Sequence, residues 1–206
     1  MQAIIDACHS GAIDAGIACV ISNRPGAPGL EKAAVAGITA ITIDHREFET
    51  REAFDRALAA ELRHHEVDLV VLAGFMRILS TAFIDEYMGR LLNIHPSLLP
   101  KYPGLNTHQR ALDAGDTEAG VTVHFVTLQL DGGPPILQAS VAIEPGDTAQ
   151  TLAERVMLKE HVIYPLAVDW FIAKRLVLED GKALLDGAVL PAQGLAYRPD
   201  MRHCAA

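Results

Sequence analysis

Short apolar runs of strand length alternate with helix-like segments along most of this chain. Strands are expected at residues 17–22, 38–43, 69–72 and 91–95, and helices at 1–9, 30–36, 50–65, 79–89, 107–114 and 151–174. Strands and helices in this order build a parallel sheet with helices on its faces. Runs at 121–127 and 136–143 add an antiparallel pair joined by the loop at Asp131. We therefore predict one α/β domain over residues 1–206, with a Rossmann-like, mostly parallel sheet, helices on both faces and an antiparallel strand pair near the C-terminal half.

Three local signals refine this prediction. Residues 69–72 are apolar and rich in valine, which is typical of a strand buried on both faces. Thr50 begins a helix, although Glu52 lies one place too early for a capping box. Thr151 is followed three residues later by Glu154, so we expect Thr151 to cap the long helix.

The composition excludes several classes of protein. The 206 residues are 50% hydrophobic, which argues against disorder, and their formal charge of −9 argues against a nucleic-acid partner. The longest apolar stretches are too short to cross a bilayer, so no membrane partner is expected. Cys8, Cys19 and Cys204 are few and scattered, as expected of reduced thiols in a cytoplasmic protein. His, Cys, Asp and Glu form no metal-ligand spacing, so we predict no metal.

Polar side chains gather at the end of the strand predicted at 91–95. Asn93 and His95 are alternate residues, so they face the same way, and Pro96 ends the strand. Open α/β sheets bind ligands at such strand ends. In isolation Asn93 reads as a turn residue, His95 as an ordinary strand-end histidine, and Asp131 before two glycines as a turn former. Together an amide, an imidazole and a carboxylate can form a metal-free acyl-transfer site.

The motifs around these residues resemble one known family. The segments that carry the resemblance are LAGFMRIL at 72–79, NIHPSLLPKYPG at 93–104, LDGGP at 130–134 and EHVIYP at 160–165. They occur in the order found in the phosphoribosylglycinamide formyltransferases of purine synthesis. The similarity extends from Met1 to about residue 196, which is nearly the whole chain.

The resemblance implies a reaction and three catalytic residues. A formyl group passes from 10-formyltetrahydrofolate to the amine of glycinamide ribonucleotide, through a tetrahedral intermediate that carries an oxyanion. Fixed donors to such an oxyanion contribute about 2.7–4 kcal/mol each in comparable sites. Asn93 and His95 are the expected donors. Asp131 would stabilise the charged imidazole and help move the amine proton, through water.

The resemblance also implies two substrate subsites. The folate would contact the residues Met76, Arg77, Ile78, Leu79, Val126, Leu130 and Asp131, and the glycines 132 and 133 would let the backbone approach it. Glycinamide ribonucleotide would contact Met76, Pro96, Gly104 and Glu160. Glu160 would accept hydrogen bonds from ribose hydroxyls, although alone it reads as a solvent-facing helix residue. His108 and His124 are expected to be supporting residues, and the protein to be a monomer or homodimer.

The chain departs from the family pattern at its start. Family members place a strand and a Gly/Ser/Asn-rich phosphate loop ahead of the first helix, whereas Met1 here already lies at that helix. The strand would be central, between the strands at 17–22 and 69–72, so that without it two apolar edges stay unpaired. We expect an N-terminally truncated domain, the simplest explanation being a start codon assigned too late. Met157 also stands where the family tends to carry a polar residue near the phosphate.

Three other functions have to be weighed. Formyltetrahydrofolate hydrolase shares the fold and the three catalytic residues, but it usually carries an extra N-terminal domain and a histidine where Pro96 stands. Methionyl-tRNA formyltransferase would need a further C-terminal nucleic-acid-binding domain and a less acidic chain. A non-catalytic remnant that binds folate but not phosphate is supported only by the missing loop.

Overall fold

The structure is a computed structural model that describes residues 1–201. Its helices are α1 (Gln2–His9), α2 (Pro28–Val35), the 3₁₀ turn η1 (His45–Glu47), α3 (Arg51–His64), α4 (Thr81–Glu86), α5 (Thr107–Asp113) and α6 (Ala149–Ile172). Its strands are β1 (Val20–Ser22), β2 (Ala40–Thr42), β3 (Val70–Leu72), β4 (Leu91–His95), β5 (Glu118–Phe125), β6 (Pro135–Ala142), β7 (Leu176–Glu179), β8 (Lys182–Leu185), β9 (Ala188–Val189) and β10 (Leu195–Ala196).

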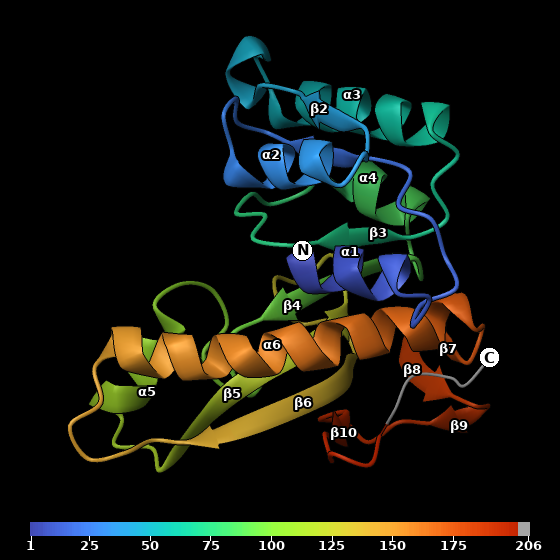
Figure 1. Cartoon of the computed structure of the whole chain (residues 1–206). Helices are drawn as coiled ribbons and strands as arrows, with labels where there is room; N and C mark the ends of the chain where they lie inside the picture. Colours follow the sequence, from blue (N-terminus) through green and yellow to red (C-terminus); the bar gives the residue numbers. More distant parts are fainter. Residues whose placement is uncertain (202–206) are drawn as a thin grey trace.

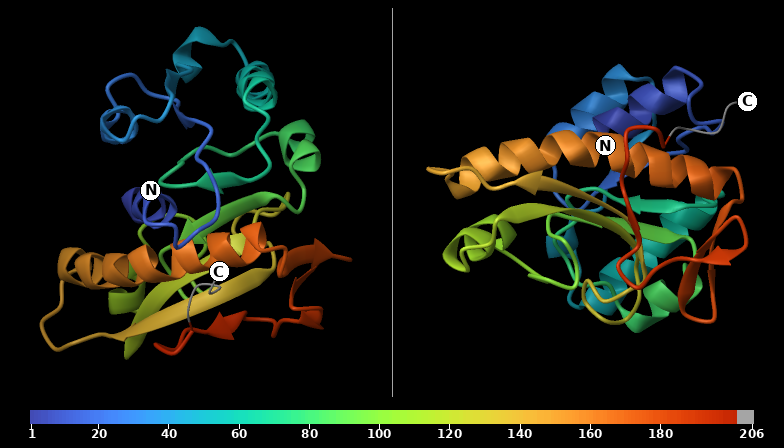
Figure 2. Two further views of the ribbon diagram at one scale, coloured as in Figure 1. Left: turned by 45° about the vertical axis from the view of Figure 1, so that its right-hand side comes forward. Right: turned by 90° about the horizontal axis from the view of Figure 1, so that it is seen from below.

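The largest sheet has the order β10-β6-β5-β4-β3. Strand β4 lies within the sheet, parallel to β3 on one side and antiparallel to β5 on the other. The β5–β6 pair is antiparallel, as predicted, and the long helix α6 lies along the sheet (Figures 1 and 2). The predicted α/β class is therefore confirmed, and the fold places the end of β4 in the middle of the molecule.

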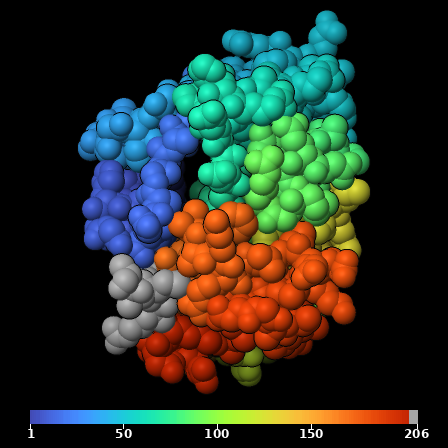
Figure 3. Space-filling model, turned by 90° about the vertical axis from the view of Figure 1, so that its right-hand side faces the viewer, coloured from blue at the N-terminus to red at the C-terminus, as the bar shows by residue number. Residues whose placement is uncertain are grey.

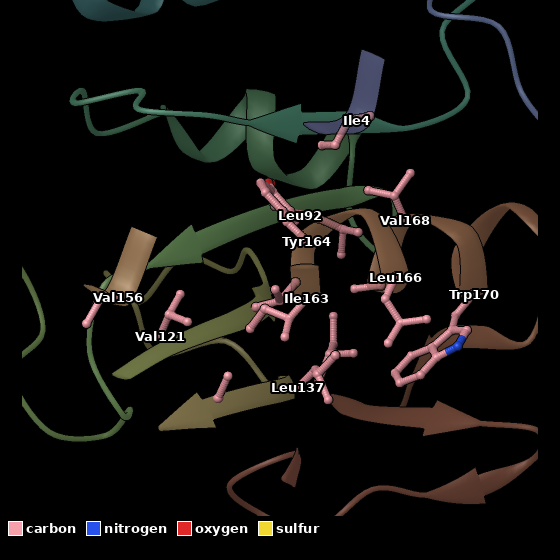
Figure 4. Packing of buried hydrophobic residues seen from close by; sticks show 14 of the residues in the cluster. Ile4, Leu92, Val121, Leu137, Val156, Ile163, Tyr164, Leu166, Val168 and Trp170 are labelled. Carbon is pink, nitrogen blue, oxygen red and sulfur yellow. The ribbon is translucent and has the colours of Figure 1, made fainter. Parts of the chain in front are cut away.

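Helix α6 covers one face of the sheet and packs on it (Figure 1). Its buried side chains pack against apolar residues of β4, β5 and β6, in the cluster that Figure 4 shows. The hydroxyl of Tyr164 donates to the carbonyl of Leu72 on β3 at 2.7 Å, and lies 3.0 Å from that of Leu92 on β4. One buried phenol thus ties α6 to two neighbouring parallel strands.

The start of α6 differs from the prediction. The N-cap is Thr148, whose hydroxyl accepts from the N–H of Thr151, while the Thr151 hydroxyl accepts from the N–H of Thr148. Threonine can replace the usual Glu or Gln at the third helical position, because its hydroxyl can accept the hydrogen bond from the N-cap N–H. The same hydroxyl also donates to Asp147 at 2.9 Å. The expected cap at Thr151 is therefore wrong by one helical turn.

The sheet is interrupted between β3 and the β1–β2 pair. Strands β1 and β2 are parallel and form a separate two-stranded sheet, beyond β3 and at the end opposite β10 (Figure 1). Within residues 1–201, β1 bonds only to β2 and β3 only to β4, which leaves one edge of each unpaired. Figure 3 shows the surface hollowed here, between the N-terminal segment in blue, the region of β3 in teal and α6 in orange.

Strand β3 is consequently less buried than its sequence suggests. All three of its residues are only partly buried, so the expectation of a strand covered on both faces is wrong. The physical reason is the missing neighbour: Leu72 and Ile21 pack at the margin of one apolar cluster, and no strand closes over them in the described part of the chain.

The part of the chain after α6 was not anticipated. Strands β7, β8 and β9 form an antiparallel meander, and β10 returns to extend the main sheet beside β6. Cys8 and Cys19 are free and partly buried, whereas Cys204 lies outside the described residues. None of the helices within residues 1–201 combines the length and the apolar character needed to span a bilayer.

Candidate active site

Asn93 and His95 lie side by side at the carboxyl end of β4, as the alternation of a strand requires. The antiparallel register places Asn93 opposite His124 and His95 opposite Thr122 of β5. Asn93 is partly buried, and His95 has 6% of its surface exposed. Strand β4 is paired with β3 as far as Asn93 and with β5 as far as His95, which fixes the backbone at both positions.

His124 orients the amide of Asn93. The Nδ1 atom of His124 lies 2.8 Å from the carbonyl of Phe125, which can only accept, so Nδ1 carries the hydrogen. Nε2 is then the acceptor, and it lies 3.1 Å from the Asn93 amide nitrogen, which donates to it. Burial lowers the pKa of His124 and keeps the ring neutral. One amide N–H of Asn93 is held in this bond, and the other remains for a substrate.

His95 is held by the loop that follows β4. Its Nε2 donates to the carbonyl of Tyr102 at 2.9 Å, and its Nδ1 lies 3.4 Å from Oδ2 of Asp131. We expected an N–H of His95 to point at the substrate, whereas in this structure both ring nitrogens face protein oxygens. The Nδ1 atom, beside Asp131, is therefore the ring nitrogen that faces the other catalytic candidates.

Asp131 is the third of the catalytic candidates. Its carboxylate has 9% of its surface exposed, accepts from the backbone N–H of Gly104 at 2.8 Å, and lies 3.9 Å from Nε2 of His124. Asp131 has a φ of 49°, the left-handed conformation that turns its side chain back from the β5–β6 loop. Gly133 passes so close to the carbonyl of Phe125 that a Cβ would overlap it. The glycine is therefore required by the packing of the hairpin itself.

Comparison with known proteins adds to this geometry. Residues 1–168 match the family model described as Formyl transferase. The chain is 54% identical over 196 residues to the phosphoribosylglycinamide formyltransferase of Escherichia coli (strain K12), covering 95% of this chain and 92% of that protein. The chain belongs to the formyl transferase family. The Haemophilus influenzae phosphoribosylglycinamide formyltransferase is 50% identical over the same shares of both chains.

Solved structures agree with the family assignment. The phosphoribosylglycinamide formyltransferase of Coxiella burnetii, solved in complex with CHES, superimposes with a TM-score of 0.91 at 50% identity, covering 96% of this chain and 92% of that one. Glycinamide ribonucleotide transformylase 1 of Symbiobacterium toebii gives a TM-score of 0.87 at 47% identity, with coverages of 89% and 87%. The predicted family is confirmed, and with it the expectation of a formyl-transferring enzyme.

In this formyl transferase, the residues predicted for the folate lie on two loops, at 73–80 after β3 and at 126–134 between β5 and β6. Met76, Ile78 and Leu130 are more than half exposed, at 70%, 61% and 59%. Leu79 is 6% exposed and packs in a core cluster, so only its backbone remains for a ligand. The guanidinium of Arg77 stacks on the Phe54 ring at 5.2 Å. Val126 is partly buried at the margin of the cluster that contains Leu79.

Glu160 is the acceptor-side residue that the structure characterises best. It is half-buried on α6, and the alternative of a solvent-facing helix residue is not what the structure shows. Burial raises the pKa of Glu160, opposed by the positive charges of His161, the Met1 amino group and His95. Pro96 and Gly104 border the catalytic candidates, Pro96 by following His95 and Gly104 through its bond to Asp131.

Tyr102 is a site residue that sequence reasoning missed. Its contribution is a backbone carbonyl, which any residue carries, and its position depends on a φ of 56°. The Tyr-Pro-Gly turn after the strand was the only available signal. His124 was expected to be a supporting residue, and its bond to Asn93 agrees with that role. Among residues 1–201 no three His, Cys, Asp or Glu side chains converge as metal ligands would.

Proposed function

We propose that this protein transfers the formyl group of 10-formyltetrahydrofolate to the amine of glycinamide ribonucleotide, in purine biosynthesis and in the cytoplasm. The single observation that carries the proposal is the convergence of Asn93, His95 and Asp131 at the end of β4. The relatives named phosphoribosylglycinamide formyltransferase, at about half identity over nearly the whole chain, support the choice of substrates.

Each residue of the group has a distinct part in the reaction. The free amide N–H of Asn93 donates to the oxyanion as the tetrahedral intermediate forms. His95, held between the Tyr102 carbonyl and Asp131, adds positive charge beside that oxygen when its ring is protonated. The Asp131 carboxylate stabilises this charge and takes up the amine proton, through water, and the intermediate then collapses with cleavage of the bond between the formyl carbon and the folate nitrogen, which receives that proton. The Gly104 N–H holds the carboxylate in place throughout.

The two substrates would approach from different sides of these residues. The pterin of the folate lies against the exposed Met76, Ile78 and Leu130, with backbone groups of Arg77 and Leu79 as hydrogen-bond partners. The ribose hydroxyls of the ribonucleotide bind Glu160, whose partial burial on α6 suits a buried polar contact. Met76, Pro96 and Gly104 border the reacting amine between these two subsites.

The opening between β1 and β3 belongs to the same proposal. We infer that a parallel strand fits between the two unpaired edges, and that a phosphate-binding loop follows it at the start of α1. In Figure 1 the N-terminus lies near the end of β3, where a strand parallel to β3 would finish. A helix N-terminus with a preceding glycine-rich loop provides N–H donors for a phosphate.

The alternatives differ in their acceptor. A hydrolase would use water, and a folate-binding remnant would transfer nothing. The half-buried carboxylate of Glu160 and the relatives named phosphoribosylglycinamide formyltransferase favour a ribonucleotide acceptor over water, and the intact group at Asn93, His95 and Asp131 argues against a remnant.

The test is formyl transfer from 10-formyltetrahydrofolate, or a deaza analogue, to glycinamide ribonucleotide. The 206-residue chain is compared with a version extended by the codons upstream of Met1, and His95→Ala in each provides the background rate. Transfer by the extended protein alone supports both the function and the role of the opening. Transfer by both proteins rejects the role of the opening, and release of formate without transfer favours the hydrolase.

A further inference from the structure

One loop contacts both His95 and Asp131. The carbonyl of Tyr102 accepts the Nε2 hydrogen of His95 at 2.9 Å, and two residues later the Gly104 N–H donates to Asp131 at 2.8 Å. The same loop therefore sets both the tautomer of the His95 imidazole and the position of the Asp131 carboxylate. Both contacts use backbone groups, so they depend on the conformation of the loop.

This conformation is unusual and needs support. Tyr102 has a φ of 56°, in the left-handed region that a non-glycine residue adopts only when its surroundings hold it there. The Tyr102 hydroxyl donates to Oδ2 of Asp116 at 2.9 Å, and Asp116 follows helix α5. The Arg110 guanidinium lies 5.1 Å from the Tyr102 ring and donates to the Pro103 carbonyl at 2.6 Å. The side chain of Tyr102 thus anchors the loop to α5.

Asp116 is the fixed end of this anchor. Its backbone N–H donates to the carbonyl of Ala111 at 3.1 Å, and its side chain has only 18% of its surface exposed. The Lys101 ammonium lies 3.0 Å from each Asp116 oxygen, but Lys101 is 56% exposed and this ion pair faces solvent. The phenol is the inner partner of the carboxylate, and it is the one connected to His95 through the loop.

We propose that Tyr102 and Asp116 are positioning residues, which hold the loop so that the Tyr102 carbonyl keeps the hydrogen on Nε2 of His95 and leaves Nδ1 facing Asp131. The catalytic consequence rests on the proposed function of His95. The positioning itself is a property of the protein without substrates. Tyr102 and Asp116 act through the loop and touch neither the substrates nor the reacting atoms.

Two measurements test the proposal. The first is the ¹⁵N spectrum of the histidine rings in the substrate-free protein, in which the His95 signals are assigned by their loss in His95→Gln. The second is the pair kcat and KM for formyl transfer. The variants are Tyr102→Phe, which removes one hydroxyl, Asp116→Ala, and Asp116→Asn, which keeps an oxygen for the phenol. Asp113→Ala is the matched control, since Asp113 is an exposed carboxylate at the end of the same helix.

The expected result separates positioning from a general loss of structure. Tyr102→Phe and Asp116→Ala move the His95 ring signals toward a mixture of tautomers and lower kcat by about 10-fold with KM nearly unchanged, as for a small misplacement of a catalytic group. Asp116→Asn retains most of the activity, and Asp113→Ala matches the unmodified protein. Unchanged His95 signals in both Tyr102→Phe and Asp116→Ala would overturn the proposal. Shifted signals, when neither the 206-residue chain nor the extended version transfers a formyl group, would support the positioning and reject the proposed function instead.

Discussion

The bond between Asn93 and His124 allows a quantitative prediction about catalysis. The neutral His124 ring accepts one amide hydrogen of Asn93 at 3.1 Å and so selects the orientation in which the other can reach an oxyanion. His124→Phe keeps an aromatic ring at a position that is 2% exposed, but it removes the acceptor. Any loss of activity then reports on the orientation of the amide rather than on a cavity.

The magnitude follows from the strength of one hydrogen bond. A net contribution of about 1 kcal/mol corresponds to a factor of about 5 in the population of the productive orientation, so kcat of His124→Phe should fall by about 5-fold. Asn93→Ala removes the oxyanion donor itself and should lower kcat by about 10²–10³-fold. In the double variant the amide is already absent, so His124→Phe should add nothing further.

The assay is a double-mutant cycle on kcat for formyl transfer, measured with saturating substrates in a chain that shows activity. The expected coupling energy is about 1 kcal/mol, nearly the whole effect of His124→Phe. If the two substitutions multiply their effects independently, His124 does not act through Asn93 and the reasoning fails. Thermal unfolding of each variant shows whether a loss of folded protein contributes to the result.

Three further predictions concern single positions. Asp131→Asn should lower kcat by orders of magnitude while the folate dissociation constant, measured by fluorescence titration, changes little; an unchanged kcat would exclude Asp131 as the proton acceptor. Glu160 has a pKa raised above 4.5 by burial, so its stabilising effect is present below that pH and is lost as the pH rises through the higher folded value. Glu160→Gln should therefore raise the unfolding temperature at neutral pH but not near pH 4, and it should weaken acceptor binding; an equal gain at both pH values would contradict this. Tyr164→Phe leaves the carbonyls of β3 and β4 without the buried phenol and should lower the free energy of unfolding by about 1–3 kcal/mol in urea titrations, whereas no change would mean that water replaces the hydroxyl.

The predicted elements differ in how well they match the structure, for physical reasons. Strand β4 has the bounds 91–95 that were predicted, because the apolar run before it and Pro96 after it are local signals. The cap of α6 was misplaced, because Thr148 and Thr151 are both capable caps and the choice depends on Asp147 nearby. Strands β7 to β10 are short and have weak local signals. They are stabilised by pairing with one another and, for β10, by pairing with β6.

The site shows the same division between local and tertiary information. The sequence by itself determined the types of the reacting groups and their placement, because the alternation of one strand puts Asn93 and His95 on the same side. A further strand between β1 and β3 was predicted from the family resemblance rather than from any local pattern, and within residues 1–201 one edge of each of these two strands is unpaired.

The tertiary structure is needed to say which atoms of the His95 and Asp131 side chains are already hydrogen-bonded within the protein. The Nε2 N–H of His95 donates a hydrogen bond to a carbonyl of the following loop, and Asp131 accepts one from a backbone N–H of the same loop. Hydrogen bonds to backbone groups have no residue-type signature, and their geometry depends on a left-handed residue anchored to a separate helix. Strand alternation gives side chains a direction from local geometry alone, whereas protonation, tautomer and burial are set by atoms that the fold brings from elsewhere in the chain.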